Sequence, residues 1–244
     1  MEVFDQVKEI IDQSSNIVFL GGAGVSTASG IPDFRSATGL YNQESGTNYS
    51  PEYMLSHTFY KEDPESFTKY YKHNLIHKEA KPNRAHYALA ELEKRGKLNA
   101  VITQNIDGLH QMAGSEKVIE IHGNLRDYYC VDCSKSYCQD FVLESDGLNR
   151  CDICGGIIRP DVVLYEEQLD TIKQMKSIEA ISKADVFIVG GTSLMVYPAA
   201  GYLRYYRGNK LILINMDSTP QDSFADYVIN DDIAGVLGDL VGID

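Results

Sequence analysis

The sequence predicts an α/β fold in which a doubly wound parallel sheet carries a smaller inserted lobe, part helical and part zinc ribbon. Two observations support this prediction. Apolar, strand-like runs recur along the chain with helix-patterned segments between several of them, an alternation typical of parallel sheets. Two further stretches break the alternation, and one of them holds all of the cysteines. We therefore expect a single domain over residues 1–244 with two lobes.

The predicted strands are short apolar runs that fit a buried parallel sheet. They are Ile17–Leu20, Ala100–Thr103, Val118–Ile121, Val186–Val189, Leu211–Ile214 and Tyr227–Ile229. Ahead of the first run, Val3, Val7, Ile10 and Ile11 follow helical spacing. This spacing predicts an amphipathic helix that packs on the sheet.

The lobe boundaries follow from where the alternation is interrupted. We assign residues 1–36, 81–124 and 159–244 to the lobe of the large sheet. Residues 37–80, which are polar and rich in tyrosine with helical spacing, form the helical part of the small lobe. Residues 125–158 form its cysteine-bearing part. A cleft between two lobes is where a substrate is expected to bind.

Composition limits the possible partners and locations. The chain has 244 residues, of which 43% are hydrophobic and 23% charged, with a net charge of −13, and this is enough to build a globular core. The acidic balance argues against a nucleic-acid surface, which needs clustered lysine and arginine. The N-terminus lacks the basic and apolar regions of a secretion signal, and no apolar run suits a membrane span. We therefore expect a cytoplasmic monomer without a membrane or nucleic-acid partner.

The glycine-rich segment Gly21–Ser36 follows the first predicted strand directly. Gly22 and Gly24 have no side chain to block a pyrophosphate, and the residues after them can open a helix whose N–H groups favour an anion. This predicts a dinucleotide site. Thr27 stands where the common G-x-G-x-x-G fingerprint has its third glycine, so a plain tight turn is the alternative.

An unusual loop, Ile31-Pro32-Asp33-Phe34-Arg35, comes after this turn. Pro32 fixes one backbone dihedral, while Phe34 offers an aromatic face and Arg35 a guanidinium fork. Such a loop can close over a bound ligand. An ordinary surface loop is the alternative.

The cysteines form two pairs with the spacing of a structural zinc site. Cys130 and Cys133 make the first pair, Cys151 and Cys154 the second. Each pair can bring two thiolates to one ion, and disulfides are unexpected in a chain without a secretion signal. Four thiolates close the coordination shell, so the metal should hold the small lobe together without taking part in chemistry. We expect Cys138 to be a free thiol.

Polar residues follow two of the predicted strands. Asn105 and Asp107 come after Ala100–Thr103 and can hydrogen-bond a carboxamide. His122 comes after Val118–Ile121, and its unperturbed pKa of about 6.5 suits a general base. We expect the remaining histidines, His57, His73, His77, His86 and His110, to be structural.

Two further loops stand at strand ends, Gly190–Ser193 and Asn215–Asp217. Parallel α/β sheets bind ligands at the carboxyl ends of their strands, so both are candidate nucleotide contacts. The alternative for each is a turn without a ligand.

In combination and in this order, seven motifs resemble the sirtuins, which are NAD-dependent protein lysine deacylases. The motifs are GGAGVSTASGIPDFRS, TQNIDGLHQMAG, EIHGN, CVDC with CDIC, RPDVVLYEEQLD, GGTSLMVYPAA and LILINMD. The resemblance spans nearly the whole chain and is closest to the catalytic core of bacterial-type members. It implies a Rossmann-like sheet, one structural Zn2+ in the small lobe, and NAD in the cleft as a consumed co-substrate.

The resemblance also implies a set of site residues. His122 and Asn105 would be catalytic, and Val163 and Tyr165 would wall a tunnel for the acyl-lysine. The substrate peptide would add as a strand between Val163–Glu167 and Leu194–Val196. The implied cofactor contacts are Gly22, Ala23, Gly24, Thr27, Phe34, Arg35, Gln104, Asn105, Ile106, Asp107, His122, Gly191, Thr192, Ser193, Asn215 and Ile233.

The implied reaction transfers the acyl group of an acyl-lysine to ADP-ribose, with release of nicotinamide, and yields free lysine and O-acetyl-ADP-ribose. His122 would act as base on the ribose hydroxyls. Thr68 and Tyr71 align with a Tyr-x-x-Arg pair found in relatives that prefer acidic acyl groups, so we expect a preference for acetyl. Glu166 departs from the family, which commonly has glycine there.

Three alternatives stay open from the sequence. A mono-ADP-ribosyltransferase would use the same NAD contacts to modify a protein. A redox dehydrogenase is disfavoured by the missing third glycine and by the Asn105, Asp107 and His122 cluster. A zinc-ribbon binding protein without turnover would not need His122 and Asn105.

Overall fold

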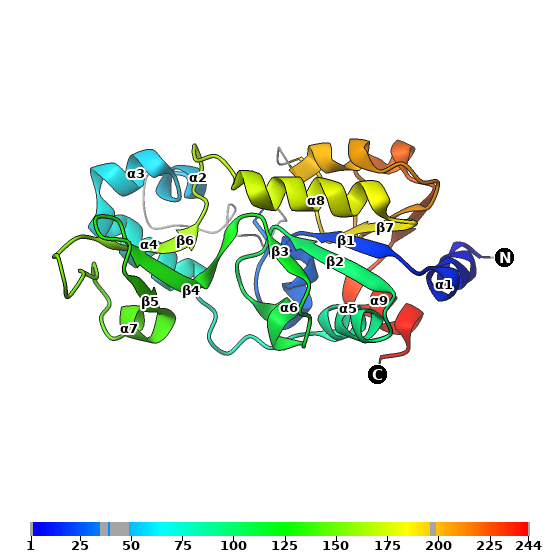
Figure 1. Cartoon of the computed structure of the whole chain (residues 1–244), viewed down its shortest axis with the longest axis horizontal. Helices are drawn as coiled ribbons and strands as arrows, with labels where there is room; N and C mark the ends of the chain where they lie inside the picture. Colours follow the sequence, from blue (N-terminus) through cyan, green and yellow to red (C-terminus); the bar gives the residue numbers. More distant parts are fainter. Residues whose placement is uncertain (1, 35–38, 40–48, 196–198, 244) are drawn as a thin grey trace.

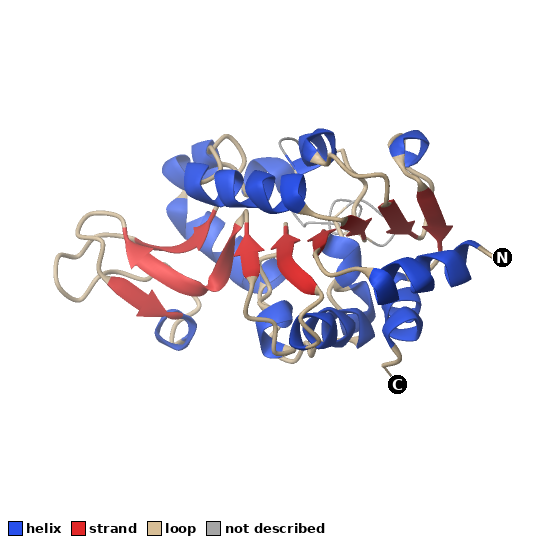
Figure 2. Cartoon of the chain, turned by 45° about the vertical axis from the view of Figure 1, so that its right-hand side comes forward, coloured by secondary structure: helices blue, strands red, loops and turns tan. Residues whose placement is uncertain are grey.

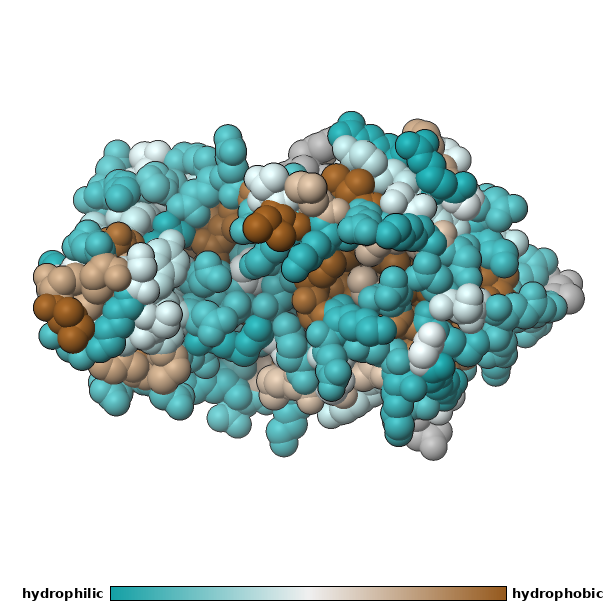
Figure 3. Space-filling view, viewed as in Figure 1, coloured by the Kyte–Doolittle hydropathy of each residue, from teal (hydrophilic) through white to brown (hydrophobic). Residues whose placement is uncertain are grey.

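The computed structural model describes residues 2–34, 39, 49–195 and 199–243. The molecule is elongated, with a large sheet and its helices at one end and a smaller sheet with short helices at the other (Figure 1). Both termini lie in the part of the molecule that carries the large sheet. Hydrophilic residues predominate on the face shown in Figure 3, as expected for a chain with a net charge of −13, and hydrophobic ones gather in a few patches.

The predicted parallel sheet is confirmed. Its strands are β1 (Ile17–Gly21), β2 (Leu98–Thr103), β3 (Val118–Glu120), β7 (Val186–Gly190), β8 (Leu211–Asn215) and β9 (Tyr227–Asn230). They pair in the order β3-β2-β1-β7-β8-β9, and every pair is parallel. The chain order reverses between β1 and β7, which is the switch point where doubly wound sheets bind ligands.

Helices cover both faces of this sheet (Figure 2). The helices α1 (Val3–Gln13), α5 (Arg84–Lys94) and α9 (Ile233–Val241) pack on one face, with Ile17 and Phe19 of β1 in their cluster. Val18 and Leu20 point into the second cluster, beneath α8 (Thr171–Lys183) and the 3-10 helix Ala199–Tyr205. Both faces are buried, which explains the uninterrupted apolar run. The predicted N-terminal helix is confirmed, with Val7 and Ile11 buried.

The smaller part is built around an antiparallel sheet that the sequence analysis did not predict. Its strands, in the order β5-β4-β6, are β5 (Ser136–Cys138), β4 (Gly123–Cys130) and β6 (Ile158–Val162). The helices beside it are α2 (Pro51–Met54), α3 (His57–Glu62), α4 (Pro64–Leu75) and α7 (Gln139–Leu143). A third hydrophobic cluster joins α4 to β4 through Phe67, Tyr71 and Tyr128. The lobe boundaries given above stay a prediction.

One lysine fastens the helices of the smaller part to its cysteine-bearing segment. Lys72 of α4 donates to the carbonyls of Val142, Ser145 and Gly147, and to Asn149 Oδ1 at 2.6 Å. Its ammonium thus joins α4 to acceptors that all lie within residues 142–149, a segment far from it in the sequence. Among the described residues, no helix combines the length and apolarity that crossing a membrane requires.

Candidate active site

A cavity of about 830 Å³ opens at the carboxyl ends of β1, β2, β7 and β8 and extends to α4 and β6 of the smaller part. This volume is typical of a small-molecule site. The predicted site residues that line it are Gly22, Ala23, Gly24, Phe34, Gln104, Asn105, Ile106, Asp107, His122, Val163, Tyr165, Gly191, Thr192, Ser193 and Asn215. The fold therefore brings most of the predicted set to one place.

Two predicted cofactor contacts lie outside the cavity lining, and a third falls outside the described residues. Thr27 is exposed outside the cavity lining, and its hydroxyl donates to the carbonyl of Gly24 at 2.9 Å. Ile233 is buried in the core against Gly190, so its side chain faces away from the cavity. Arg35 lies outside the described residues.

The glycine turn differs from its prediction, because no α-helix begins there. Two 3-10 turns, Ala23–Val25 and Thr27–Ser29, follow β1 instead. The Gly24 N–H donates to the carbonyl of Gly191 at 2.8 Å, and a Cβ on Gly24 would lie 2.8 Å from the Gly191 Cα. Close packing of the two loops at the switch point therefore requires glycine here.

His122 is held in one tautomer. Its Nδ1 lies 2.9 Å from the carbonyl oxygen of Gln104, which only accepts, so Nδ1 carries the hydrogen and Nε2 keeps its lone pair. Burial lowers the pKa of His122, and the bond to Gln104 partly opposes this. The ring is therefore neutral near pH 7.

The residue after His122 has to be glycine. Gly123 has a φ of +78°, and a Cβ there would lie 1.9 Å from the Asp161 carbonyl oxygen.

A chain of polar contacts joins the ends of three strands. Gln104 Nε2 donates to Thr192 Oγ1 at 3.0 Å, and the Thr192 N–H donates to Asn215 Oδ1 at 2.9 Å. Asn215 is 8% exposed, and its Nδ2 has no partner among the described residues. A buried amide without an acceptor is costly, so a ligand oxygen in the cavity would satisfy it.

Ser26 is a site residue that the sequence analysis missed. Its hydroxyl donates to Asp107 Oδ2 at 2.7 Å and accepts from Asn105 Nδ2 at 3.0 Å. Ser26 is buried and lines the cavity. It thereby orients both polar residues that follow β2. In the sequence, the feature that could have indicated this role is the hydroxyl of Ser26 inside the glycine-rich turn, close to Gly22 and Gly24.

Apolar side chains from α4 and β4 form one wall of the cavity. Phe67, Tyr71 and Leu125 line it, whereas Thr68 is buried outside it and its hydroxyl donates to the Pro64 carbonyl. Among the described residues, no lysine or arginine lines the cavity. This wall therefore suits a neutral, largely apolar group.

Two buried histidines, His86 and His110, contact each other outside the cavity lining. The rings of His86 and His110 lie 4.7 Å apart between centroids. Burial lowers the pKa of His86 to about 4; burial and the neighbouring His86 lower that of His110 to about 3. Of the other histidines, His57 pairs with Glu167 at 2.8 Å, and His77 lines the cavity.

The buried pair of His86 and His110 should make the folded protein less stable in acid. Unfolded histidines take up protons below about pH 6.5, while the folded pair stays neutral, so the unfolded state binds more protons. We expect the free energy of unfolding to fall by roughly 3 kcal/mol or more between about pH 6.5 and pH 4. Urea unfolding across this range measures it. His110→Leu should flatten the dependence, and exposed His73→Leu should not. Parallel curves for wild type and His110→Leu would contradict the assignment.

The four predicted metal ligands converge. The Sγ atoms of Cys130, Cys133, Cys151 and Cys154 all lie within 4.8 Å of one another, with pairs at 3.4 and 3.5 Å. A tetrahedral zinc site with Zn–S bonds of about 2.3 Å places sulfurs about 3.8 Å apart. The cluster is thus positioned for one metal ion, and Cys138 lies outside it at the end of β5.

Known proteins match this chain closely. A Clostridium perfringens protein named NAD-dependent protein deacetylase is 58% identical over 238 residues, covering 97% of this chain and 98% of the relative. A solved Sir2 variant with deacetylated p53 peptide and 3'-O-acetyl ADP ribose has a TM-score of 0.87 and 40% identity, covering 96% of this chain and 95% of that one. A Sir2 complex with p53 peptide and NAD+ has a TM-score of 0.85 and 39% identity, covering 99% and 98%. The Sir2 family model matches residues 22–198, and the chain therefore belongs to this family.

Proposed function

We propose that this chain is an NAD-dependent protein lysine deacetylase. It transfers the acyl group of an acyl-lysine to ADP-ribose and releases nicotinamide, free lysine and O-acetyl-ADP-ribose. The observation that carries the proposal is the single cavity in which a neutral His122, the Ser26–Asn105–Asp107 cluster and the switch-point loops meet. The names of the relatives support it.

The residues present fit NAD. The unpartnered amide of Asn215 suits a ribose oxygen, and the turn of Gly22, Ala23 and Gly24 leaves backbone open to a pyrophosphate. Asp107 and Ile106 would hold the carboxamide, and Thr192 and Ser193 the adenosine part. NAD supplies the activated ribose carbon that accepts the acyl oxygen. Phe34 would shield this face from water, and Arg35 stays a predicted contact.

His122 performs the proton transfer in this proposal. Its Nε2 accepts the proton of a ribose hydroxyl, while the Gln104 carbonyl keeps the Nδ1 hydrogen and stabilises the ring once it is charged. Asn105, oriented by Ser26, positions the attacking group. A base buried yet neutral at pH 7 is ready to accept a proton without first losing one.

The acyl-lysine would enter between Val163 and Tyr165 and reach the apolar wall of Phe67 and Tyr71. Desolvating a charged, unmodified lysine there would be costly, so the cavity selects the neutral acylated form. Acylated proteins are the proposed partners, bound as a strand along Val163–Glu167. We also propose that the chain acts as a cytoplasmic monomer without a nucleic-acid partner.

The deciding experiment incubates the protein with an acetyl-lysine peptide and NAD and follows nicotinamide and the product masses. Equimolar nicotinamide, deacetylated peptide and O-acetyl-ADP-ribose are expected. Nicotinamide without a change in the peptide would instead favour ADP-ribosyl transfer or glycohydrolase activity. Absence of any reaction would favour a binding protein.

The acyl preference is a separate prediction. Because the described cavity lining carries carboxylates and no arginine, a succinyl group would meet no cation there. Removal of acetyl from a given peptide should be at least about tenfold faster than removal of succinyl, since an unpaired buried charge costs more than about 1.4 kcal/mol. Competition between the two peptides, read by mass spectrometry, measures the ratio. Faster loss of succinyl would refute the prediction.

A further inference from the structure

Glu166 lies in a backbone conformation that side chains rarely adopt. Its φ is +76°, in the left-handed region that favours glycine. The chain therefore tolerates strain here that a glycine would remove. Glu166 directly follows Tyr165 and lines the cavity. A residue kept in a strained conformation at a site is a reason to ask what its side chain does.

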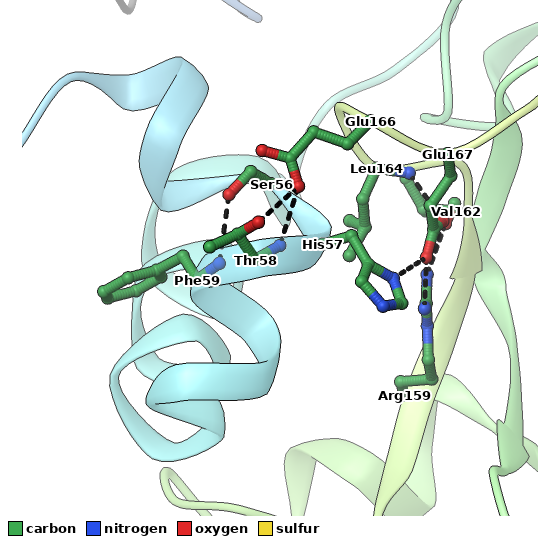
Figure 4. A network of polar contacts seen from close by, with 9 residues as sticks. All are labelled: Ser56, His57, Thr58, Phe59, Arg159, Val162, Leu164, Glu166 and Glu167. Carbon is green, nitrogen blue, oxygen red and sulfur yellow. Dashed lines mark hydrogen bonds and ion pairs between the residues drawn. The ribbon is translucent and has the colours of Figure 1, made fainter.

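The carboxylate of Glu166 is fixed on α3. Its Oε2 accepts from the Thr58 N–H at 2.9 Å and from the Thr58 hydroxyl at 2.7 Å, in the first turn of the helix (Figure 4). The hydroxyl and then the amide of Thr58 lower the pKa of Glu166, so the group is charged at neutral pH. Both bonds are made to the same carboxylate oxygen, Oε2 (Figure 4).

The backbone around Glu166 is also fixed. The Tyr165 N–H donates to the Leu55 carbonyl, and the His57 N–H donates to the Tyr165 carbonyl. The Val163 N–H donates to the carbonyl of His122 at 2.9 Å. The segment that carries Glu166 is therefore joined at one end to the histidine of the site and at the other to α3.

The neighbouring carboxylate is neutralised, whereas that of Glu166 is not. Arg159 donates to both oxygens of Glu167, at 2.7 and 3.0 Å, and His57 lies 2.8 Å from Oε1. Burial would raise the pKa of Glu167, but the bonds from Arg159 and His57 lower it to about 2. Within the described residues, no lysine or arginine pairs with Glu166, and His57 and Tyr53 are titratable groups near it. Its negative charge is thus available to a ligand.

We propose that Glu166 is a specificity-determining residue that favours substrate peptides with lysine or arginine next to the acyl-lysine. This inference rests on the proposed function, since it assumes that a peptide lies along Val163–Glu167. Asp33 and Asp217 also line the cavity, and no lysine or arginine among the described residues does. Among the described lining residues, a basic peptide would therefore meet carboxylates and no lysine or arginine.

The test compares two acetyl-lysine peptides. One has arginine on both sides of the modified lysine, and the other has glutamate at the same two positions. Wild type should show a kcat/KM about three- to fivefold higher for the arginine peptide, the size expected of exposed charge pairs. The difference should lie in KM and shrink between about 0.05 M and about 0.5 M salt. Glu166→Gln keeps an oxygen for Thr58 but removes the charge, and should remove most of the preference.

Two further variants control the experiment. Glu144→Gln makes the same change in net charge at an exposed position outside the cavity lining, and should keep the full preference. Thr58→Val leaves the charge and the bond from the backbone N–H of residue 58 but removes the hydroxyl bond that helps to hold the carboxylate, and should weaken the preference. Equal kcat/KM for both peptides in wild type, or an unchanged ratio in Glu166→Gln, would overturn the inference and leave the deacetylase proposal standing.

Binding of the same labelled peptides, measured by fluorescence anisotropy without turnover, separates the two proposals. Preferential binding of the arginine peptide without any product would support the role of Glu166 and overturn the deacetylase proposal. Absence of both binding and turnover would overturn both.

Discussion

Replacing Cys151 with serine, or removing the metal with a chelator, is expected to abolish activity by unfolding the smaller part of the molecule. Structural zinc contributes about 10 kcal/mol or more of apparent binding free energy, and that energy supports folding. Cys130 and Cys151 are buried in the same hydrophobic cluster as Tyr71, which lines the cavity. Loss of the metal therefore removes one wall of the site.

Metal content by mass spectrometry, limited proteolysis and deacetylation rate, measured on the same samples, check this expectation. Cys138→Ser is the matched control, because it changes the same chemistry outside the cluster. It should retain metal, fold and rate. A fully active, metal-free Cys151→Ser protein would contradict the structural role of the cluster.

Replacing His122 with alanine is expected to lower kcat by about 10²- to 10⁴-fold, the usual contribution of a general base, while the fold persists. Because burial lowers the pKa of His122, the wild-type rate should hold down to pH values below about 6.5 and fall only under more acidic conditions, as Nε2 becomes protonated. Steady-state kinetics across pH, with NAD affinity by calorimetry, measure both effects.

The exposed His73→Ala variant should behave as wild type in these measurements. Unchanged turnover in His122→Ala would remove the assignment of the base. A large loss of NAD affinity with unchanged kcat would instead make His122 a binding residue.

The parts of the fold that could be predicted are those determined by residues close together in the sequence. The strands of the large sheet are buried on both faces, so runs such as Ile17–Leu20 are apolar throughout and can be recognised without knowing their partners. The metal site could be predicted because each cysteine pair brings two ligands together within one short turn.

The parts that could not be predicted depend on distant segments. The antiparallel sheet pairs Tyr128 with Tyr137 and with Pro160, and neither partner is visible in the sequence around Tyr128. The glycine turn forms 3-10 turns and not a helix because it packs on Gly191. Ser26 and Glu166 take their roles from partners such as Asn105 and Thr58, which only the folded chain brings near.

The bond between Lys72 and Asn149 has a consequence for synthesis on the ribosome. These residues are 77 positions apart, so at about 5–20 residues per second the helix waits roughly 4–15 s for its acceptors. During that interval Phe67 and Tyr71 lack Tyr128 and Val142, against which they pack in the finished protein. The nascent chain thus exposes an aromatic surface that holding chaperones would have to cover until the zinc-binding segment has emerged.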